Sequence, residues 1–388
     1  MKAIVSIDPV RFPLTGIGRY AFELVRHLSE LDEISDLRLL SGVRFVSSLP
    51  EAGEFCGGGK TSLFIRQLKK HMLKSRIAVD LASGLLSRMK RRTLLRFEDH
   101  VFHSPNYYLP EFAGVSVSTF HDLSMYTWAH CHPPERVRFM QKQLMLALRR
   151  ADMLITDSEF TRQEVAQYFS WPLGRIRCVS LASSAEFYPR NQAEFSAIGI
   201  RYGLTMGGYA LFAGTIEPRK NLDVLLDAYA LLPLRLRQRW PLVMTGYQGW
   251  QSDKLHERIK AASREGWVRY LGYVSAEDLP LLYAGARLFV FPSLYEGFGL
   301  PILEAMASGV PVVCSNSSSL PEVAGDAAGM CEAADVDSLA GLIEIGLEDD
   351  IWRKSTIGKG LSRAANFSWQ RCARETAAVY QEAVCSKS

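Results

Sequence analysis

The stretch FPSLYEGFGLPILEAMASGVPVV, residues 291–313, holds two glutamates, Glu296 and Glu304, separated by seven residues around a Gly-Phe-Gly-Leu-Pro turn. The apolar run RLFVFPS at its start is typical of a central strand buried on both faces. Pro301 suits the first turn of a helix, where its missing N–H leaves no hydrogen bond unmade. We therefore expect Glu296 in a strand-to-helix loop and Glu304 in the first turn of the helix.

This loop has the features of a ligand-binding turn. Gly297 and Gly299 carry no side chain, so the backbone can approach a ligand closely. The free amides at the start of the helix favour an anion, most naturally a phosphate. The simpler alternative is that Glu304 stabilises the helix dipole and Glu296 is a solvated loop residue.

Strands and helices alternate along the whole chain, which predicts βαβ units and parallel sheets. The expected strands are KAIVSID, VFHS, VSVSTFHD, ADMLITDS, YALFAGT, PLVMTG, VRYLGYV, RLFVFPS and VPVVCS. The rhythm breaks over residues 186–205, a polar stretch with Pro189 that we interpret as a linker. The sequence therefore predicts an α/β protein with two doubly wound domains, residues 1–185 and 206–366, and ligands at the carboxyl ends of the strands.

Two further turns follow apolar strands. In AGTIEPRKNL, residues 213–222, Arg219 and Lys220 precede a helix that begins near Asn221. Adjacent cations at this point can clamp a diphosphate, although an exposed basic pair is also common. In RFPLTGIGRY, Gly16 and Gly18 lie between the first strand and the first helix, but the third glycine of a dinucleotide site is missing.

Histidine and cysteine give weaker indications. His121 and Asp122 end a strand in STFHDLS, and His121 becomes a candidate substrate contact if it faces a cleft. His130, Cys131 and His132 adjoin in AHCHPP, but no fourth metal ligand is in view, so we favour a polar loop. The seven cysteines are scattered and none is spaced as C-x-x-C, which disfavours a disulfide framework and makes the cytoplasm the expected compartment.

Positive charge gathers in residues 60–96, where eleven basic residues stand against the single acid Asp80. Two apolar stripes at helical spacing lie among them: Leu63, Phe64, Leu68, Met72 and Leu73, then Leu85, Leu86 and Met89. A basic amphipathic helix can lie in an anionic membrane interface. The alternative is a core-facing helix with a solvated basic back. We expect residues 60–96 to bind an anionic membrane surface.

The motifs together resemble a known family. EGFGLPILEAMASGVPVV resembles the E-x7-E motif of the family 4 retaining glycosyltransferases, and GTIEPRKN resembles their diphosphate-binding turn. TFHDLS and ITDSEFTRQEV resemble the matching N-terminal motifs, so the likeness covers about residues 1–385. It implies the GT-B fold, in which two Rossmann-like domains face a cleft, the second holds the nucleotide sugar and the first holds the acceptor. It also implies that the last helix, residues 367–385, packs back on the first domain.

The resemblance assigns roles to residues by position. His121 would contact the sugar near the reacting carbon, and Glu296 would hold hydroxyl groups of the donor sugar. Arg219 and Lys220 would bind the diphosphate as it leaves. The other donor-binding residues that it implies are Gly16, Gly18, Thr215, Tyr273, Val274, Phe298, Gly299, Leu300 and Glu304. Tyr273 and Val274 would lie against the base and Glu304 would hold the ribose. Family members need no metal, so we expect neither a metal nor a cofactor.

Substrates follow only from the same likeness, which is greatest to bacterial O-polysaccharide mannosyl- and D-rhamnosyltransferases. It implies transfer of mannose or D-rhamnose from a GDP-sugar to a growing lipid-linked polysaccharide of the O-antigen. The basic segment, residues 60–96, adds the expectation that the protein works at the inner face of the cytoplasmic membrane. One alternative is another GT-B enzyme, such as a UDP-sugar-dependent transferase or a nucleotide-sugar epimerase. A second is a non-enzyme, a membrane- or nucleic-acid-binding scaffold that uses residues 60–96. We expect no nucleic-acid partner, because a scaffold leaves the phosphate-type turns unexplained.

Overall fold

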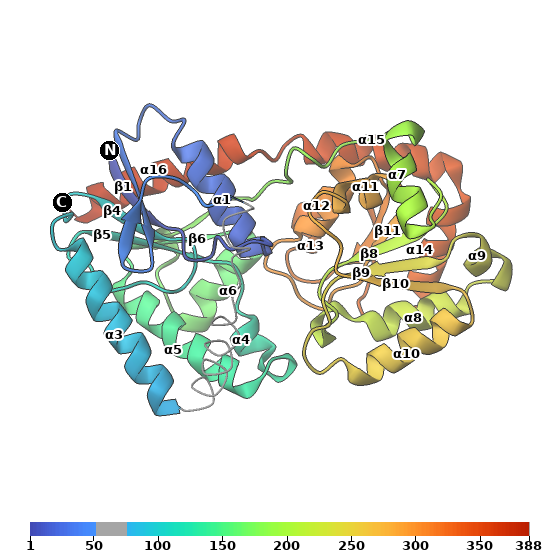
Figure 1. Ribbon diagram of the computed structural model, residues 1–388, viewed down its shortest axis with the longest axis horizontal. Coiled ribbons are helices and arrows are strands. Elements are labelled where there is room, and N and C mark those ends of the chain that lie inside the picture. The colour runs from blue at the N-terminus through green and yellow to red at the C-terminus, as the bar shows by residue number, and fades with distance from the viewer. Residues whose placement is uncertain (52–75, 388) are drawn as a thin grey trace.

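Two sheets form the framework of the protein, one in each half of the chain (Figure 1). The computed structural model describes residues 1–51 and 76–387. The first sheet has the order β3-β2-β1-β4-β5-β6-β7 and is parallel except for β3. Its strands are β1 (Lys2–Ser6), β2 (Asp36–Ser41), β3 (Arg44–Val46), β4 (Val101–Ser104), β5 (Val115–Phe120), β6 (Met153–Thr156) and β7 (Ile176–Cys178).

The second sheet is parallel throughout and has the order β10-β9-β8-β11-β12-β13. Its strands are β8 (Ala210–Ala213), β9 (Leu242–Thr245), β10 (Val268–Gly272), β11 (Leu288–Phe291), β12 (Val312–Ser315) and β13 (Ala328–Cys331). Both sheets contain the strand order 3-2-1-4-5-6 that defines the Rossmann-like arrangement. The predicted fold class is therefore confirmed.

Helices cover both faces of each sheet (Figure 1). In the first half they are α1 (Gly16–Leu28), α3 (Arg76–Leu94), α4 (Ser124–Thr127), α5 (Pro134–Arg150) and α6 (Glu159–Phe169), with the 3-10 turns η1 (Ala129–Cys131) and η2 (Leu173–Arg175). In the second they are η3 (Pro218–Lys220), α7 (Gln192–Tyr202), α8 (Leu222–Leu231), α9 (Leu234–Arg239), α10 (Asp253–Arg264), α11 (Leu279–Ala284), α12 (Leu300–Ala307), α13 (Leu320–Ala324), α14 (Val336–Glu348), α15 (Asp350–Ala364) and α16 (Trp369–Lys387).

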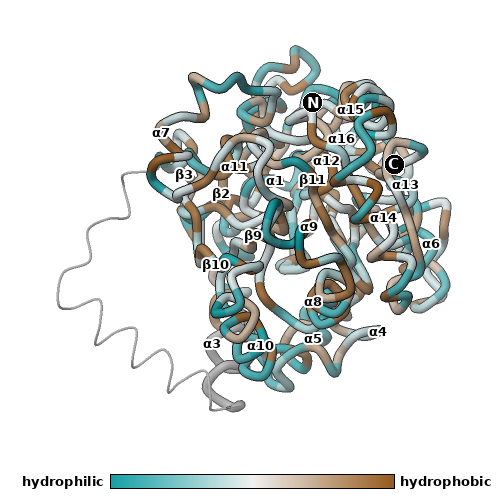
Figure 2. Tube along the Cα trace, turned by 90° about the vertical axis from the view of Figure 1, so that its right-hand side faces the viewer, coloured by the Kyte–Doolittle hydropathy of each residue, from teal (hydrophilic) through white to brown (hydrophobic). Residues whose placement is uncertain are grey.

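Alternation along β1 shows why these strands are apolar throughout. Ala3 and Val5 belong to the cluster that includes Leu24 of α1, whereas Ile4 belongs to the cluster that includes Leu144 of α5. Each face of the sheet is thus covered by helices, as in other parallel sheets. Figure 2 shows the result as hydrophobic residues along the strands and mixed hydropathy along the surrounding helices.

The segment between the sheets differs from the expected linker. Residues 186–205 contain α7, whose N-terminus is closed by a capping box between Asn191 and Glu194. α7 packs against α11 and so belongs structurally with the second sheet. After α15 the chain returns, and α16 packs against α1, β5 and β6 of the first sheet (Figure 1). After the roles that the resemblance implies, we call the body built on the first sheet, which includes α16, the acceptor-side domain, and the body built on the second sheet the donor-side domain.

The structure describes only residues 76–96 of the basic segment, residues 60–96. Its first apolar stripe lies outside the described residues. The second stripe lies on α3, where Leu85, Leu86 and Met89 are 61%, 46% and 43% exposed, so it does not face the core. Lys90, one of the cations expected to bind a membrane surface, is instead buried and paired with Asp8. No helix in the described part of the chain has the length and apolarity needed to cross a bilayer.

Candidate active site

The strand order brings two predicted loops together. β8 pairs with β11, and between these strands the direction in which the sheet grows reverses. The loop that carries Arg219 follows β8, and the loop that carries Glu296 follows β11. Such reversal points are where ligands bind in open α/β sheets. Residues 76 positions apart in the sequence therefore meet at one edge of the sheet.

A compact group of charges lies at this edge. Glu296 forms ion pairs with both Lys220 and Arg219. Its Oε1 lies 2.6 Å from Lys220 Nζ, and its Oε2 lies 3.0 Å from Arg219 Nη1. Arg219 Nη2 also donates to Glu217 Oε1 at 2.8 Å. Burial would raise the pKa of Glu296, but Arg219 and Lys220 outweigh it and hold that pKa at about 2. The group thus holds two carboxylates and two cations, and an arriving diphosphate has to compete with carboxylates for them.

The glycines of this loop are required by close packing within the protein. At Gly297 an added Cβ would lie 1.7 Å from the carbonyl oxygen of His121, so any side chain would push the two domains apart. Gly299 has φ +129°, which disfavours other residues, and its Cβ would lie 3.0 Å from Leu320. Phe298 is buried between them. Within the described residues the amides of Phe298, Gly299 and Leu300 have no protein acceptor, which leaves them available to an anion.

The acceptor-side domain holds the residues on either side of Glu296. Before it, the Tyr295 hydroxyl accepts the amide hydrogen of Leu123 at 2.9 Å and donates to Glu164 of α6. After it, the Gly297 carbonyl accepts from the hydroxyls of Ser158 at 2.6 Å and Thr161 at 3.1 Å. The placement of Glu296 therefore depends on contact between the two domains.

His121 lies in the same contact, but its ring is engaged within its own domain. Nδ1 lies 2.7 Å from a carboxylate oxygen of Asp157, and Nε2 lies 3.0 Å from the Pro105 carbonyl. Both partners are acceptors, which favours a ring that carries two protons. Burial alone would lower the pKa of His121, but Asp157 raises it above its usual value. His121 thus reaches the Glu296 loop through its carbonyl group, against which Gly297 packs.

Glu304 lies further into α12 than the sequence predicts. The helix begins at Leu300, so Glu304 is its fifth residue and the first turn contains no acid. Burial raises the pKa of Glu304 to about 7, and the charge of Arg19 and the hydroxyl of Tyr283 oppose this rise. Arg19 comes from the first turn of α1, so the acceptor-side domain also places a cation near this carboxylate.

The glycines before α1 show two different environments. The Thr15 hydroxyl caps the helix by accepting the Gly18 amide at 3.2 Å. A Cβ at Gly18 would lie 2.8 Å from the Pro9 carbonyl oxygen, so close packing explains this glycine. Gly16 is exposed and would have open space around a Cβ. Only Gly16 therefore remains positioned to offer its backbone to a ligand.

The remaining predicted donor contacts sit at the same sheet edge. Thr215 follows β8, and Tyr273 and Val274 follow β10. Val274 is buried, whereas Tyr273 is exposed and stacks on Tyr247, with ring centroids 4.5 Å apart. Tyr247 follows β9 and was not predicted. The two rings form an aromatic surface at the carboxyl ends of adjacent strands.

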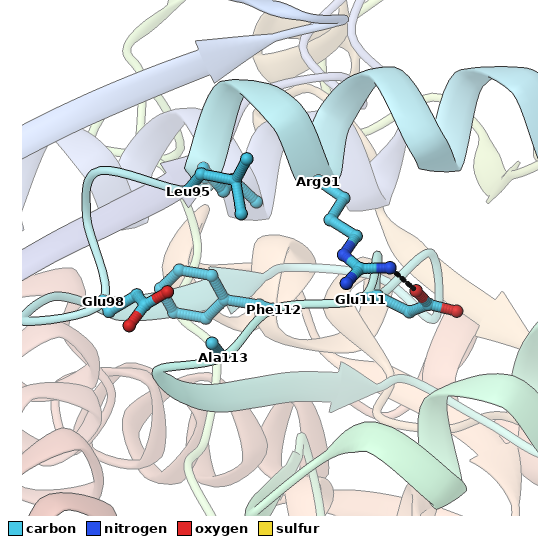
Figure 3. Close-up of a pocket in the computed structure, with 7 residues that line it drawn as sticks. Arg91, Leu95, Glu98, Glu111, Phe112 and Ala113 are labelled. Carbon is cyan, nitrogen blue, oxygen red and sulfur yellow. Dashed lines mark hydrogen bonds and ion pairs between the residues drawn. The ribbon is translucent and has the colours of Figure 1, made fainter.

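A separate pocket of about 280 Å³ lies elsewhere (Figure 3). The residues that line it are Arg91, Leu94, Leu95, Glu98, Glu111, Phe112 and Ala113. Glu98 precedes β4 and Ala113 precedes β5, so the pocket lies at the amino edge of the first sheet. The candidate catalytic residues follow the carboxyl ends of strands, so this pocket is not part of their site.

Sequence reasoning missed Glu217, Tyr295 and Glu164. Glu217 stands inside the quoted motif, and a carboxylate beside two cations in an apolar setting could have been recognised as their partner. Tyr295 and Glu164 are in contact because the two domains are in contact, and the sequence around either residue does not indicate this bond.

Comparison with known proteins places the chain among transferases. Residues 204–362 match the family model described as glycosyl transferases group 1. The O-antigen chain mannosyltransferase B of Escherichia coli is 45% identical over 381 residues, which are 98% of this chain and 100% of that protein. The serotype-specific mannosyltransferase WbdA of Escherichia coli is 35% identical over 247 residues, which are 62% of this chain and 30% of that protein.

Solved structures share the fold at low identity. Anabaena Alr3699/HepE in complex with UDP-glucose has a TM-score of 0.72 and 17% identity, and covers 98% of this chain and 100% of its own. WaaG, a glycosyltransferase involved in lipopolysaccharide biosynthesis, has a TM-score of 0.67 and 14% identity, and covers 98% of this chain and 99% of its own.

Proposed function

Because the chain belongs to the glycosyl transferases group 1 family, we propose that this glycosyltransferase moves mannose from a GDP-sugar to the growing, lipid-linked O-polysaccharide. Support comes from the relative that matches the whole chain, which is named an O-antigen chain mannosyltransferase. The structural observation that carries the proposal is the contact of Arg219 and Lys220 with Glu296 at the reversal point of the second sheet.

In the proposed reaction the bond between the sugar carbon and the diphosphate oxygen breaks, and the oxygen of an acceptor hydroxyl forms the new bond to that carbon and passes its proton to the departing diphosphate oxygen. Negative charge grows on the diphosphate, and Arg219 and Lys220 are the cations available to stabilise it. The diphosphate draws these cations from Glu296, whose carboxylate then becomes free to accept hydroxyl hydrogens of the sugar. Glu217 keeps its bond to Arg219 and fixes the guanidinium plane.

The anomeric configuration is proposed to be retained. The sequence predicts two carboxylates for this site, Glu296 and Glu304. The proposed role of Glu304 is to bind the ribose and that of Glu296 is to bind sugar hydroxyl groups, so neither is proposed as a nucleophile that forms a covalent intermediate. We therefore favour attack of the acceptor on the face from which the diphosphate leaves. Product analysis by NMR of the new glycosidic bond tests retention directly.

The nucleoside is proposed to lie between Glu304 and the Tyr247–Tyr273 surface. A carboxylate can accept hydrogen bonds from both ribose hydroxyls. Exposed aromatic rings offer a base a stacking surface.

The second candidate function is that of a UDP-sugar-dependent transferase, which is favoured by the UDP-glucose complex of a structural neighbour.

A nucleotide-release assay distinguishes these functions. The purified protein is incubated with GDP-mannose, GDP-D-rhamnose or UDP-glucose, with and without an O-polysaccharide acceptor. Acceptor-dependent release of GDP from GDP-mannose supports the proposal. Release of UDP alone supports the second candidate, and altered sugar without nucleotide release would support an epimerase.

We further propose that the enzyme works at an anionic membrane surface on the cytoplasmic side. Leu85 and Met89 share the exposed face of α3 with Arg88 and Arg92, and residues 84–96 contain no acid. An exposed apolar ridge flanked by cations matches an anionic bilayer interface in both hydropathy and charge. A lipid-linked acceptor is confined to such a surface, so docking by the acceptor-side domain brings enzyme and acceptor together.

A further inference from the structure

His132 is a buried histidine with no hydrogen-bond partner. Its side chain is 5% exposed, and neither ring nitrogen meets a partner within the described residues. A neutral imidazole always carries one N–H, and leaving such a group buried and unpaired is unfavourable. Unpaired groups of this kind in a folded protein call for an explanation, such as a ligand.

His132 lies where the two domains meet. Its ring packs against Trp250 of the donor-side domain, with ring centroids 5.4 Å apart. The indole N–H of Trp250 donates to the carbonyl of Cys131, the preceding residue. The Arg136 guanidinium lies 4.8 Å from the Trp250 ring centroid. Backbone and side-chain contacts thus fix the imidazole at the domain boundary.

A second unpaired donor lies nearby. Arg219 Nε is buried and also lacks a partner within the described residues, although both terminal nitrogens of the same guanidinium are bonded. Gly249, which precedes Trp250, donates its amide hydrogen to the Ile216 carbonyl at 2.9 Å. A Cβ at Gly249 would lie 3.2 Å from the Cβ of Glu217, the residue that pairs with Arg219. Each domain therefore contributes one unsatisfied N–H donor to the same neighbourhood.

The chemistry of this neighbourhood selects an oxyanion. Burial, reinforced by Arg136 and Arg219, lowers the pKa of His132 to about 4, so at neutral pH the ring is an uncharged donor. Those two cations also disfavour a metal ion. Among the described residues, no three histidine, cysteine, aspartate or glutamate side chains gather as metal ligands. An oxyanion is the partner that suits an unpaired N–H donor beside cations.

We propose that His132 donates a hydrogen bond from the acceptor-side domain to a diphosphate oxygen of the nucleotide donor. This inference rests on the proposed function, which supplies the diphosphate. Arg219 and Lys220 hold the anion from the donor-side domain, and His132 holds it from the other side. Bound diphosphate thereby ties the two domains together.

The test measures binding of GDP, inorganic pyrophosphate and guanosine by calorimetry. His132→Phe keeps an aromatic ring against Trp250 but removes the donor, and it is expected to weaken GDP and pyrophosphate about tenfold while leaving guanosine unchanged. His132→Gln supplies a new N–H and is expected to recover part of the loss. His130→Ala, at the exposed neighbouring histidine, is the matched control and is expected to bind like the parent.

Stability gives an independent readout. Since His132→Phe removes an unsatisfied buried group, its melting temperature is expected to equal or exceed that of the parent. A parental affinity for GDP and pyrophosphate in His132→Phe overturns the inference, and so does an equal loss for guanosine or a loss confined to the acceptor KM. If the parent itself binds no nucleoside diphosphate, the proposed function fails too, which separates that outcome from failure of His132 alone.

Discussion

The Tyr295 hydroxyl accepts the amide hydrogen of Leu123 at 2.9 Å, and this bond joins the residue before Glu296 to the other domain. The same hydroxyl donates to Glu164. One side chain thus connects the loop of the candidate nucleotide-sugar site to two elements of the acceptor-side domain.

Removing this hydroxyl should slow turnover more than it weakens donor binding. Tyr295→Phe keeps the ring but loses both bonds, so Glu296 is held less accurately, and misplacement of a catalytic group can cost up to about a hundredfold in rate. Steady-state kinetics with GDP-mannose should therefore show a lower kcat and a nearly unchanged donor KM.

Tyr126→Phe is the matched control for this variant. Tyr126 also uses its hydroxyl within the protein, donating to the Gln141 carbonyl at 3.1 Å, but it lies outside the Glu296 loop. It should lose a similar small amount of stability and keep parental turnover. Equal kcat values for the two variants would contradict the positioning role of Tyr295.

Lys220→Ala should reduce transfer by about 10²–10³-fold, the range for loss of one donor to a developing negative charge. The sequence left an exposed basic pair as the alternative for Arg219 and Lys220, but the structure shows Lys220 buried and bonded to Glu296. Breaking a buried ion pair costs roughly 3–5 kcal/mol, so the melting temperature should also fall.

A compensating variant separates these two effects. Lys220→Met combined with Glu296→Gln removes both charges and should restore much of the melting temperature without restoring transfer. Recovery of transfer along with stability would mean that the charges of Lys220 and Glu296 have no role beyond holding the fold.

Donor affinity should increase with pH between about 6 and 8. Glu304 has a pKa of about 7 in the folded chain, and its proposed ribose contacts need the ionised form. The ionised fraction rises about tenfold over this interval, and the association constant for GDP should follow it. Glu304→Gln should bind weakly and lose this dependence, while it retains any titration of the nucleotide itself.

The same pKa predicts the opposite trend for stability without ligand. The folded chain keeps a proton on Glu304 that the unfolded chain releases above about 4.5, so the free energy of unfolding should fall as pH rises from 4.5 to about 7. Thermal unfolding of the parent and of Glu304→Gln across this range checks the sign. If the melting temperature of the parent rose relative to that of Glu304→Gln as the pH increased, the predicted trend in stability would be contradicted.

Vesicle binding should depend on the exposed ridge of α3. Co-sedimentation with phosphatidylglycerol vesicles is expected at about 0.1 M salt and should be lost near 1 M, where charges are screened beyond about 3 Å. Leu85→Ser with Met89→Ser should weaken it. The control, Leu231→Ser with Leu234→Ser, changes two exposed leucines of the donor-side domain and should bind like the parent. Equal binding to neutral phosphatidylcholine vesicles would exclude electrostatic docking.

The sequence predicts the parts of this site that depend on one strand and the turn after it. Arg219 and Glu296 each follow an apolar strand, so both could be assigned to the carboxyl edge of the second sheet. Their mutual contact requires the pairing of β8 with β11, which strand patterns alone do not give. The Tyr295 contacts require the relative placement of two domains, and the burial of Lys90 depends on Asp8, far away in the sequence.

The return of α16 to the first sheet has a consequence for how the protein is made. Tyr380 of α16 is buried and bonds to His103 of β4 at 2.7 Å, so this helix completes the core of the acceptor-side domain. At roughly 5–20 residues per second, a ribosome needs about 9 to 35 seconds to proceed from Gln192 to Trp369. During that time the nascent first domain lacks one of its covering helices, and by the end of it the donor-side domain has all its strands. The domain that is synthesised first is therefore expected to reach its final fold last.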